Sequence, residues 1–235
     1  MDSEGEAGED AEATRFARAL NDLKRRGSAL LVVGVVPDEM YERVSERMLG
    51  DERAVDPRRR VVVSDVPADD RLATTGPTTP EYARVIRRDT AARSAVAATQ
   101  SEQQPLTPDA PKVHHVDSSL GELGATLTEV IGQFDAAADG LEPAELRVAF
   151  DCLSTLAAEY DEETVFRFLH LATTQVRSNT GMAHFRLPKS ADELEVRTYA
   201  PLFDAVIELR VDGGELQQRW RFVDRSFDSE WLSVP

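Results

Sequence analysis

The chain has 235 residues, of which 41% are hydrophobic, so it can bury one sizeable core, and one domain with a tail is the simplest organisation. Aspartate and glutamate number 43 against 27 for lysine and arginine, and the resulting net charge of −16 disfavours duplex DNA binding through a general basic face. No apolar run approaches the roughly 20 residues of a membrane span, and the single cysteine, Cys152, excludes an internal disulfide and fits a reducing cytoplasm.

The basic residues are almost all arginine. Only Lys24, Lys112 and Lys189 are lysines, so 24 of the 27 basic residues are arginine. Acidic excess with arginine in place of lysine indicates a protein from a salt-loaded cytoplasm, where surface charge maintains solubility. The alternative is an ordinary acidic protein from a GC-rich genome. The acidic N-terminal stretch lacks the apolar segment of a signal peptide, which predicts a cytoplasmic location.

The N-terminal half alternates between helical and extended patterns. Residues 1–13 carry six acids among glycine and alanine, which predicts a disordered tail. Helices are predicted where apolar residues recur at helical spacing between capping signals, and strands where apolar runs are bounded by turn residues. In chain order these elements are a helix within 13–27, a strand over 28–34, a helix within 35–50, and strands over 59–65 and 82–89.

The C-terminal half continues the alternation after a surface loop at 99–113. Ser118 or Ser119 can cap a helix that starts at Leu120. The elements that follow are a strand over 146–150, a helix opened by the acids at 161–163, a strand over 181–188, a short helix within 191–203 and a hairpin over 205–224 that turns at Asp212-Gly213-Gly214.

This order predicts an α/β fold, with a mostly parallel central sheet flanked by helices and a C-terminal β-hairpin at the sheet edge. The expected single domain covers residues 14–228, and residues 229–235 form a C-terminal tail. We expect Trp220 to pack on the sheet.

The most informative stretch is the apolar run 146–150, which Asp151 closes. Such a run suits a strand buried on both faces, and an acid at its carboxyl end lies where open α/β sheets gather ligands. Asp151 is therefore either a retained ligand or metal residue, or a carboxylate that caps the turn. The same two interpretations apply to Asp65.

Three motifs in this order resemble the RecA/KaiC-like P-loop ATPases, and most closely a haloarchaeal group related to signal-transduction ATPases. They are LRVAFDCLSTL at 146–156, ETVFRFLHLATTQVRS at 163–178 and LFDAVIELRVDGGELQQRWRFVD at 202–224. The resemblance implies a RecA-like P-loop fold. It also implies that Asp151 occupies the place of the Walker B aspartate, which holds the Mg²⁺ of a bound nucleotide through water.

The phosphate loop departs from this family. A working loop has the pattern G-x-x-x-x-G-K-[S/T], in which lysine neutralises phosphate and the hydroxyl meets Mg²⁺. Gly34 can stand for the first glycine, but counting onward places Glu39, Met40 and Tyr41 at the second glycine, the lysine and the hydroxyl residue. Asp38 and Glu39 also bring negative charge, at a cost of about 1–4 kcal/mol each beside a phosphate. We therefore interpret the site as inactive in ATP hydrolysis.

The main hypothesis is a non-catalytic RecA/KaiC-like domain without a cofactor, a pseudo-ATPase that regulates signal transduction or transcription through a protein partner or homo-oligomer. Its cofactor-binding positions, Gly34 and Asp151, are then vestigial. The alternative is a weak ATP-binding protein or ATPase that uses Asp151 and Mg²⁺ and takes a cation from another subunit. A third interpretation is a structural domain whose acidic tail and 99–113 loop recruit a partner. Membrane association and direct nucleic-acid binding are not expected.

Other residue types in the chain suggest less specific chemistry. Cys152 is either a small core residue or a nucleophile without an evident base. The four histidines do not form a zinc pattern. The run Arg58-Arg59-Arg60 is either an anion-binding group or a solvated charge run.

Overall fold

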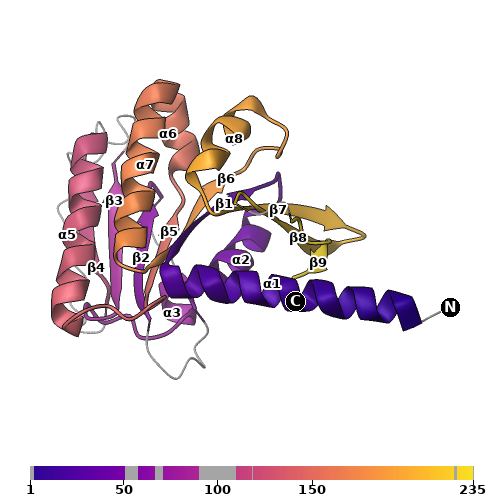
Figure 1. Ribbon diagram of the computed structural model, residues 1–235. Helices are drawn as coiled ribbons and strands as arrows, with labels where there is room; N and C mark the ends of the chain where they lie inside the picture. The colour runs from indigo at the N-terminus through magenta and orange to yellow at the C-terminus, as the bar shows by residue number, and fades with distance from the viewer. Residues whose placement is uncertain are drawn as a thin grey trace.

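The computed structural model (Figure 1) describes residues 3–50, 58–66, 71–89, 110–117, 119–224 and 227–234. The described residues form one nine-stranded sheet with helices on both faces. Its strands are β1 (Ser28–Val33), β2 (Arg59–Ser64), β3 (Ala83–Arg88), β4 (Lys112–Val116), β5 (Leu146–Phe150), β6 (Met182–Leu187), β7 (Ala205–Asp212), β8 (Glu215–Phe222) and β9 (Leu232–Ser233). The helices are α1 (Ser3–Arg26), α2 (Asp38–Leu49), α3 (Arg71–Thr74), α5 (Leu120–Ala138), α6 (Leu153–Glu159), α7 (Glu162–Ser178) and α8 (Leu194–Tyr199), followed by the 3₁₀ turn η1 (Ala200–Leu202).

The sheet has the strand order β4-β3-β2-β5-β6-β1-β7-β8-β9. All pairings from β4 through β7 are parallel, and only β8 and β9 are antiparallel. The predicted α/β architecture with a mostly parallel sheet is thus confirmed. Because parallel strands end on the same side, β1, β2, β5 and β6 direct the residues that follow them to one edge, which we call the carboxyl edge.

The central strands form because their apolar runs are buried on both faces. Every residue of β1, β2 and β5 is buried. On one face, α5 and α7 pack on β5 and β6, with the rings of Phe150 and Phe185 stacked at a centroid distance of 4.8 Å. On the other face, α1 and α2 pack on β1, β7 and β8. Trp220 belongs to this second cluster and meets Phe16 of α1 edge to face, so it packs on the sheet as predicted.

The antiparallel end of the sheet is built on a tight turn. Gly213 and Gly214, between β7 and β8, have φ values of 57° and 86°. Two consecutive positive φ values are typical of the two-residue hairpin turns that match strand twist, and glycine adopts them without steric cost. The short β9 pairs with β8 at Gln217 and Gln218, so β9 rather than β8 forms the edge.

Several boundaries differ from the sequence predictions. Helix α1 begins at Ser3, where a disordered tail was expected up to residue 13. Three short elements, α3, β4 and α6, were not predicted. Strand β4 takes the last residues of the 99–113 loop, whose residues 99–109 lie outside the described part of the chain, and β9 lies in the expected C-terminal tail. Among the described helices, none combines the length and apolar character that crossing a bilayer requires.

Candidate functional site

Gly34 follows β1 at the carboxyl edge, and its backbone explains why a glycine stands there. Its φ is 117°, and an added Cβ would lie 2.2 Å from the carbonyl oxygen of Leu209 on β7. The Gly34 N–H donates to the carbonyl oxygen of Lys189 at 2.8 Å. Close packing between neighbouring chain segments therefore requires this glycine, whether or not a phosphate ever binds beside it.

The first turn of α2 carries the residues aligned with the phosphate loop. Pro37 is the N-cap residue, and Asp38 and Glu39 place two exposed carboxylates in the first turn. Such charges complement the positive end of the helix. Met40, in the lysine position, packs against the apolar cluster between α1, α2 and the β7–β8 hairpin. No side chain from the lysine position is thus available to neutralise an anion.

Tyr41, in the hydroxyl position, makes the central contact of the site. Its hydroxyl donates to Oδ1 of Asp151 at 2.6 Å, although the two residues are 110 positions apart in the sequence. Tyr41 is 2% exposed, and Asp151 is half-buried directly after β5. A charge-assisted hydrogen bond of this length is among the stronger ones in proteins. The structure thus joins by direct contact the two residues that the sequence comparison placed at the hydroxyl position of the phosphate loop and at the Walker B aspartate.

Arg186, near the end of β6, lies between Tyr41 and the start of α2. Its guanidinium carbon is 4.3 Å from the centroid of the Tyr41 ring, which is a cation–π geometry. The same guanidinium forms an ion pair with Asp38. Arg186 therefore brings a positive charge from the same chain to the loop after Gly34, where the sequence suggested only an arginine from another subunit.

Asp65 follows β2 at the same edge. It accepts a hydrogen bond from the hydroxyl of Thr155 in α6. The Asp151 N–H donates to the carbonyl oxygen of Val63 at 2.9 Å, which extends the β2–β5 pairing up to the two acids. Cys152 is fully buried, and burial together with the charges of Asp65 and Asp151 raises the pKa of its thiol far above the ordinary value. The thiol is therefore a core group and not a nucleophile.

The arginine run at the start of β2 has a structural role that neither sequence interpretation anticipated. Arg60 is fully buried and donates to the carbonyl oxygens of Leu72 and Pro77 and to the Thr75 hydroxyl. Burial lowers its pKa to about 10. Arg59 pairs with Glu145 at 2.8 Å. These side chains hold the 71–79 segment and the start of β5, so the run is not solvated.

The histidines are separated by the fold. His114 and His115 lie on β4 and His170 on α7, while His184 on β6 is buried and bonded to the Ser45 hydroxyl at 2.7 Å. Within the described part of the chain, no three histidine, cysteine or acidic side chains are grouped so that they could hold a metal ion.

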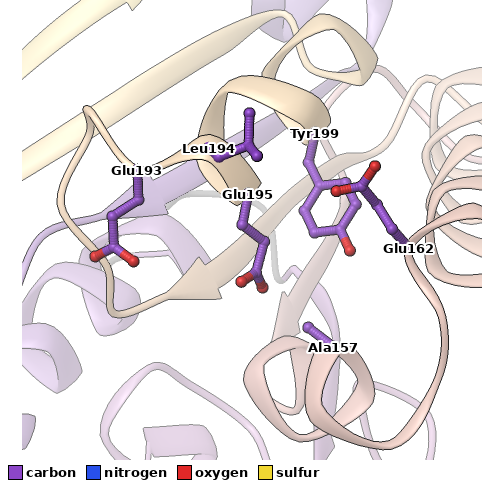
Figure 2. Close-up of a pocket in the computed structure, with 6 residues that line it drawn as sticks. All are labelled: Ala157, Glu162, Glu193, Leu194, Glu195 and Tyr199. Carbon is purple, nitrogen blue, oxygen red and sulfur yellow. The ribbon is translucent and has the colours of Figure 1, made fainter.

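A hollow of about 380 Å³ lies at the carboxyl edge between α6, the start of α7 and α8 (Figure 2). It is bounded by Ala157, Glu162, Glu193, Leu194, Glu195 and Tyr199. The ammonium of Lys189 pairs with Glu195, and the Lys189 carbonyl accepts the Gly34 N–H, so the hollow adjoins the loop after β1.

Sequence reasoning placed Gly34, Tyr41 and Asp151 at one edge but missed the contact between the last two. It also missed Arg186 and the acidic hollow. Arg186 lies within the predicted strand over 181–188. Its position near the carboxyl end of that strand was the one signal that could have placed it at the carboxyl edge. The glutamates of the hollow come from α7 and from α8 and the residue before it, and no local motif unites them.

Comparison with known proteins assigns the chain to a family but not to a function. No curated protein matches it. A family model described as a family of unknown function matches residues 27–209, from the residue before β1 into β7. The match covers most of the chain and includes both Gly34 and Asp151. The chain therefore belongs to the family of unknown function DUF7504.

Proposed function

We propose that this protein is a non-catalytic RecA/KaiC-like domain that acts as a regulatory or protein-interaction module of the cytoplasm in signal transduction or transcriptional control. The observation that carries the proposal is the hydrogen bond from the Tyr41 hydroxyl to Asp151 at 2.6 Å. In a working P-loop ATPase the corresponding aspartate serves the Mg²⁺ of the nucleotide. Here the carboxylate is engaged by a buried side chain of the same domain.

The residues present do not fit a magnesium-bound triphosphate. The lysine position holds Met40, which packs in an apolar cluster. Asp38 and Glu39 present carboxylates at the start of α2, where the phosphates would lie. Each unit charge so placed costs about 1–4 kcal/mol at surface-like dielectric. The protein is therefore expected to act without nucleotide chemistry.

Phosphate release from ATP tests the non-catalytic part of this proposal. The assay compares the wild-type chain with Asp151→Asn in multimolar KCl, with and without Mg²⁺, because an acidic protein needs salt to screen self-repulsion. We expect both proteins to release phosphate at the rate of buffer alone. Magnesium-dependent release that the Asp151→Asn variant abolishes would contradict the proposal.

The second candidate function is weak ATP binding through Asp151 and Mg²⁺. Arg186 favours it, because this side chain supplies a cation beside the start of α2 from within the same chain. A phosphate would have to displace Asp38 from Arg186 and Tyr41 from Asp151. This candidate predicts nucleotide binding that is lost in both Arg186→Met and Asp151→Ala.

A further inference from the structure

The hollow between α6, α7 and α8 carries an excess of hydrogen-bond acceptors. Glu162, Glu193 and Glu195 contribute three carboxylates (Figure 2). Only Glu195 has a cationic partner among the described residues, and this partner is Lys189. The second carboxylate oxygen of Glu195, Oε1, is buried and has no hydrogen-bond partner in the described structure. A buried acceptor without a donor is costly, so a rotation of the Glu195 side chain that turns Oε1 toward a ligand's donor would recover this cost.

Tyr199 provides a second, independent polar group. The residue is 1% exposed, yet it lines the hollow, and its hydroxyl points into the space between Glu162 and Glu195. No described residue donates to or accepts from this hydroxyl. Burial, together with the charges of Glu195 and Glu162, raises the pKa of Tyr199 to about 12. The hydroxyl therefore stays neutral at physiological pH, and its oxygen can accept a hydrogen bond.

These groups point to an extended organic cation and not to a metal ion. The glutamates of the hollow are not among any described group of side chains that could hold a metal. A guanidinium offers five N–H donors in one plane and can reach several separated acceptors at once. The apolar lining suits its alkyl chain, because Ala157 lies on one wall and Leu194 is 68% exposed at the rim.

We propose that the hollow binds an arginine side chain presented by a segment of a partner protein. This inference rests on the proposed role as an interaction module, but it does not depend on the loss of nucleotide binding. The composition of the chain argues against a second copy as the partner, because an acidic hollow favours a basic surface and this chain carries 43 acidic against 27 basic residues. A basic segment with an apolar neighbour for Leu194 is complementary to this surface.

The test uses N-acetyl-arginine methylamide as the probe and the full chain as the receptor. Chemical-shift changes of backbone amides are followed by nuclear magnetic resonance at the lowest KCl concentration at which circular dichroism shows a folded protein. The citrulline analogue, which has the same shape without the charge, is the ligand control. Glu162→Gln and Glu193→Gln remove exposed acids of the hollow, and Glu215→Gln removes an exposed acid at the distant β7–β8 turn as the matched variant.

We expect saturable shifts at residues of α6, α7 and α8 with the arginine probe and none with citrulline. Each of the two substitutions in the hollow should weaken binding about threefold and their combination about tenfold, while Glu215→Gln binds like the wild type. Shifts that are absent, equal for both probes, or unaffected by the double substitution would overturn the proposal. Sedimentation of the wild type as a monomer is expected, and self-association that the double variant abolishes would make a second copy the occupant and overturn it as well.

The probe contains no nucleotide, so the outcome of this titration does not depend on the outcome of the phosphate-release assay. A negative result here removes the arginine site and leaves the non-catalytic interpretation standing. ATP hydrolysis would contradict the non-catalytic interpretation. The arginine site would still be tested only by the arginine titration.

Discussion

The Tyr41 hydroxyl donates a hydrogen bond to Oδ1 of Asp151 at 2.6 Å and so connects the first turn of α2 to the end of β5. The ring of the same tyrosine lies under Arg186 from β6. Three elements of the carboxyl edge are thus held together by one buried side chain. In P-loop ATPases, which the sequence resembles, metal and phosphate lie between the corresponding elements.

The Tyr41–Asp151 bond should contribute measurably to stability. Tyr41→Phe removes the hydroxyl and leaves a half-buried carboxylate without this donor, so the free energy of unfolding should fall by about 1.5–3 kcal/mol. Tyr82→Phe is the control, because no hydrogen bond of the Tyr82 hydroxyl is seen among the described residues and its loss should change the free energy by less than about 0.5 kcal/mol. Denaturant unfolding in multimolar KCl measures both. Equal stabilities of the two variants would show that the bond is not formed.

Gly34 should be intolerant of a side chain for reasons of packing. In Gly34→Ala the new Cβ meets the Leu209 carbonyl at 2.2 Å on a backbone with φ of 117°. Strain and overpacking should lower the free energy of unfolding by about 3 kcal/mol or more. Gly132→Ala is the contrast, since Gly132 is exposed within α5 with no atom near its added Cβ, and this change should stabilise by about 0.5–1 kcal/mol. If Gly34→Ala left the free energy of unfolding unchanged, packing would not explain why glycine occupies this position, and phosphate binding would be the better explanation.

The predicted and observed structures agree where the physical signal is local. The apolar runs of β1, β2 and β5 are buried throughout. Ser119, one of the two predicted serines, caps α5, and α7 starts where the acids at 161–163 predicted a helix, with Asp161 as its N-cap. Short elements escaped prediction. Helix α6 has only seven residues, too few for a periodic pattern, and β4 has a mostly polar sequence with two histidines because it is half-exposed.

The location of the site could be predicted from the sequence, but the contacts between its side chains could not. The carboxyl ends of parallel strands meet at one edge, so Gly34 and Asp151 were placed there correctly. The contact between Tyr41 and Asp151 and the position of Arg186 depend on side-chain packing across strands distant in sequence, which no local pattern encodes. For the same reason Arg60, which bonds to the 71–79 segment, resembled a surface charge in the sequence.

The ion pair between Arg88 and Glu159 should contribute far more to the free energy of unfolding than an exposed ion pair does. The Arg88 side chain is fully buried at the end of β3, whereas Glu159 lies at the rim of α6. Glu159→Gln removes the negative charge that faces this buried guanidinium, which should lower the free energy of unfolding by about 3 kcal/mol. The control is Glu163→Gln, which breaks the exposed Glu163–Arg167 pair on α7 and should cost less than about 0.5 kcal/mol. If the two variants lost similar amounts of unfolding free energy, Arg88 would be stabilised by another anion or by solvent.

Stability at alkaline pH should report on Tyr199. Burial and nearby glutamates raise the pKa of Tyr199 to about 12, whereas an unfolded tyrosine ionises near pH 10. Between these values the unfolded chain releases a proton that the folded chain retains, so the free energy of unfolding falls as the pH rises. In Tyr199→Phe this contribution disappears and the fall between pH 10 and 12 should be shallower than in the wild type or in Tyr82→Phe. Parallel curves for all three proteins would exclude a raised pKa.

Calorimetric titration of ATP and ADP into the wild-type chain, with and without Mg²⁺ in multimolar KCl, tests the central claim most directly. The claim is that no functional nucleotide site remains beside Asp151, because Tyr41 engages Asp151 and Asp38 engages Arg186. It predicts no saturable heat at millimolar nucleotide under any of these conditions. Micromolar binding that requires Mg²⁺ and disappears in Asp151→Ala would contradict it and would make the domain a nucleotide sensor.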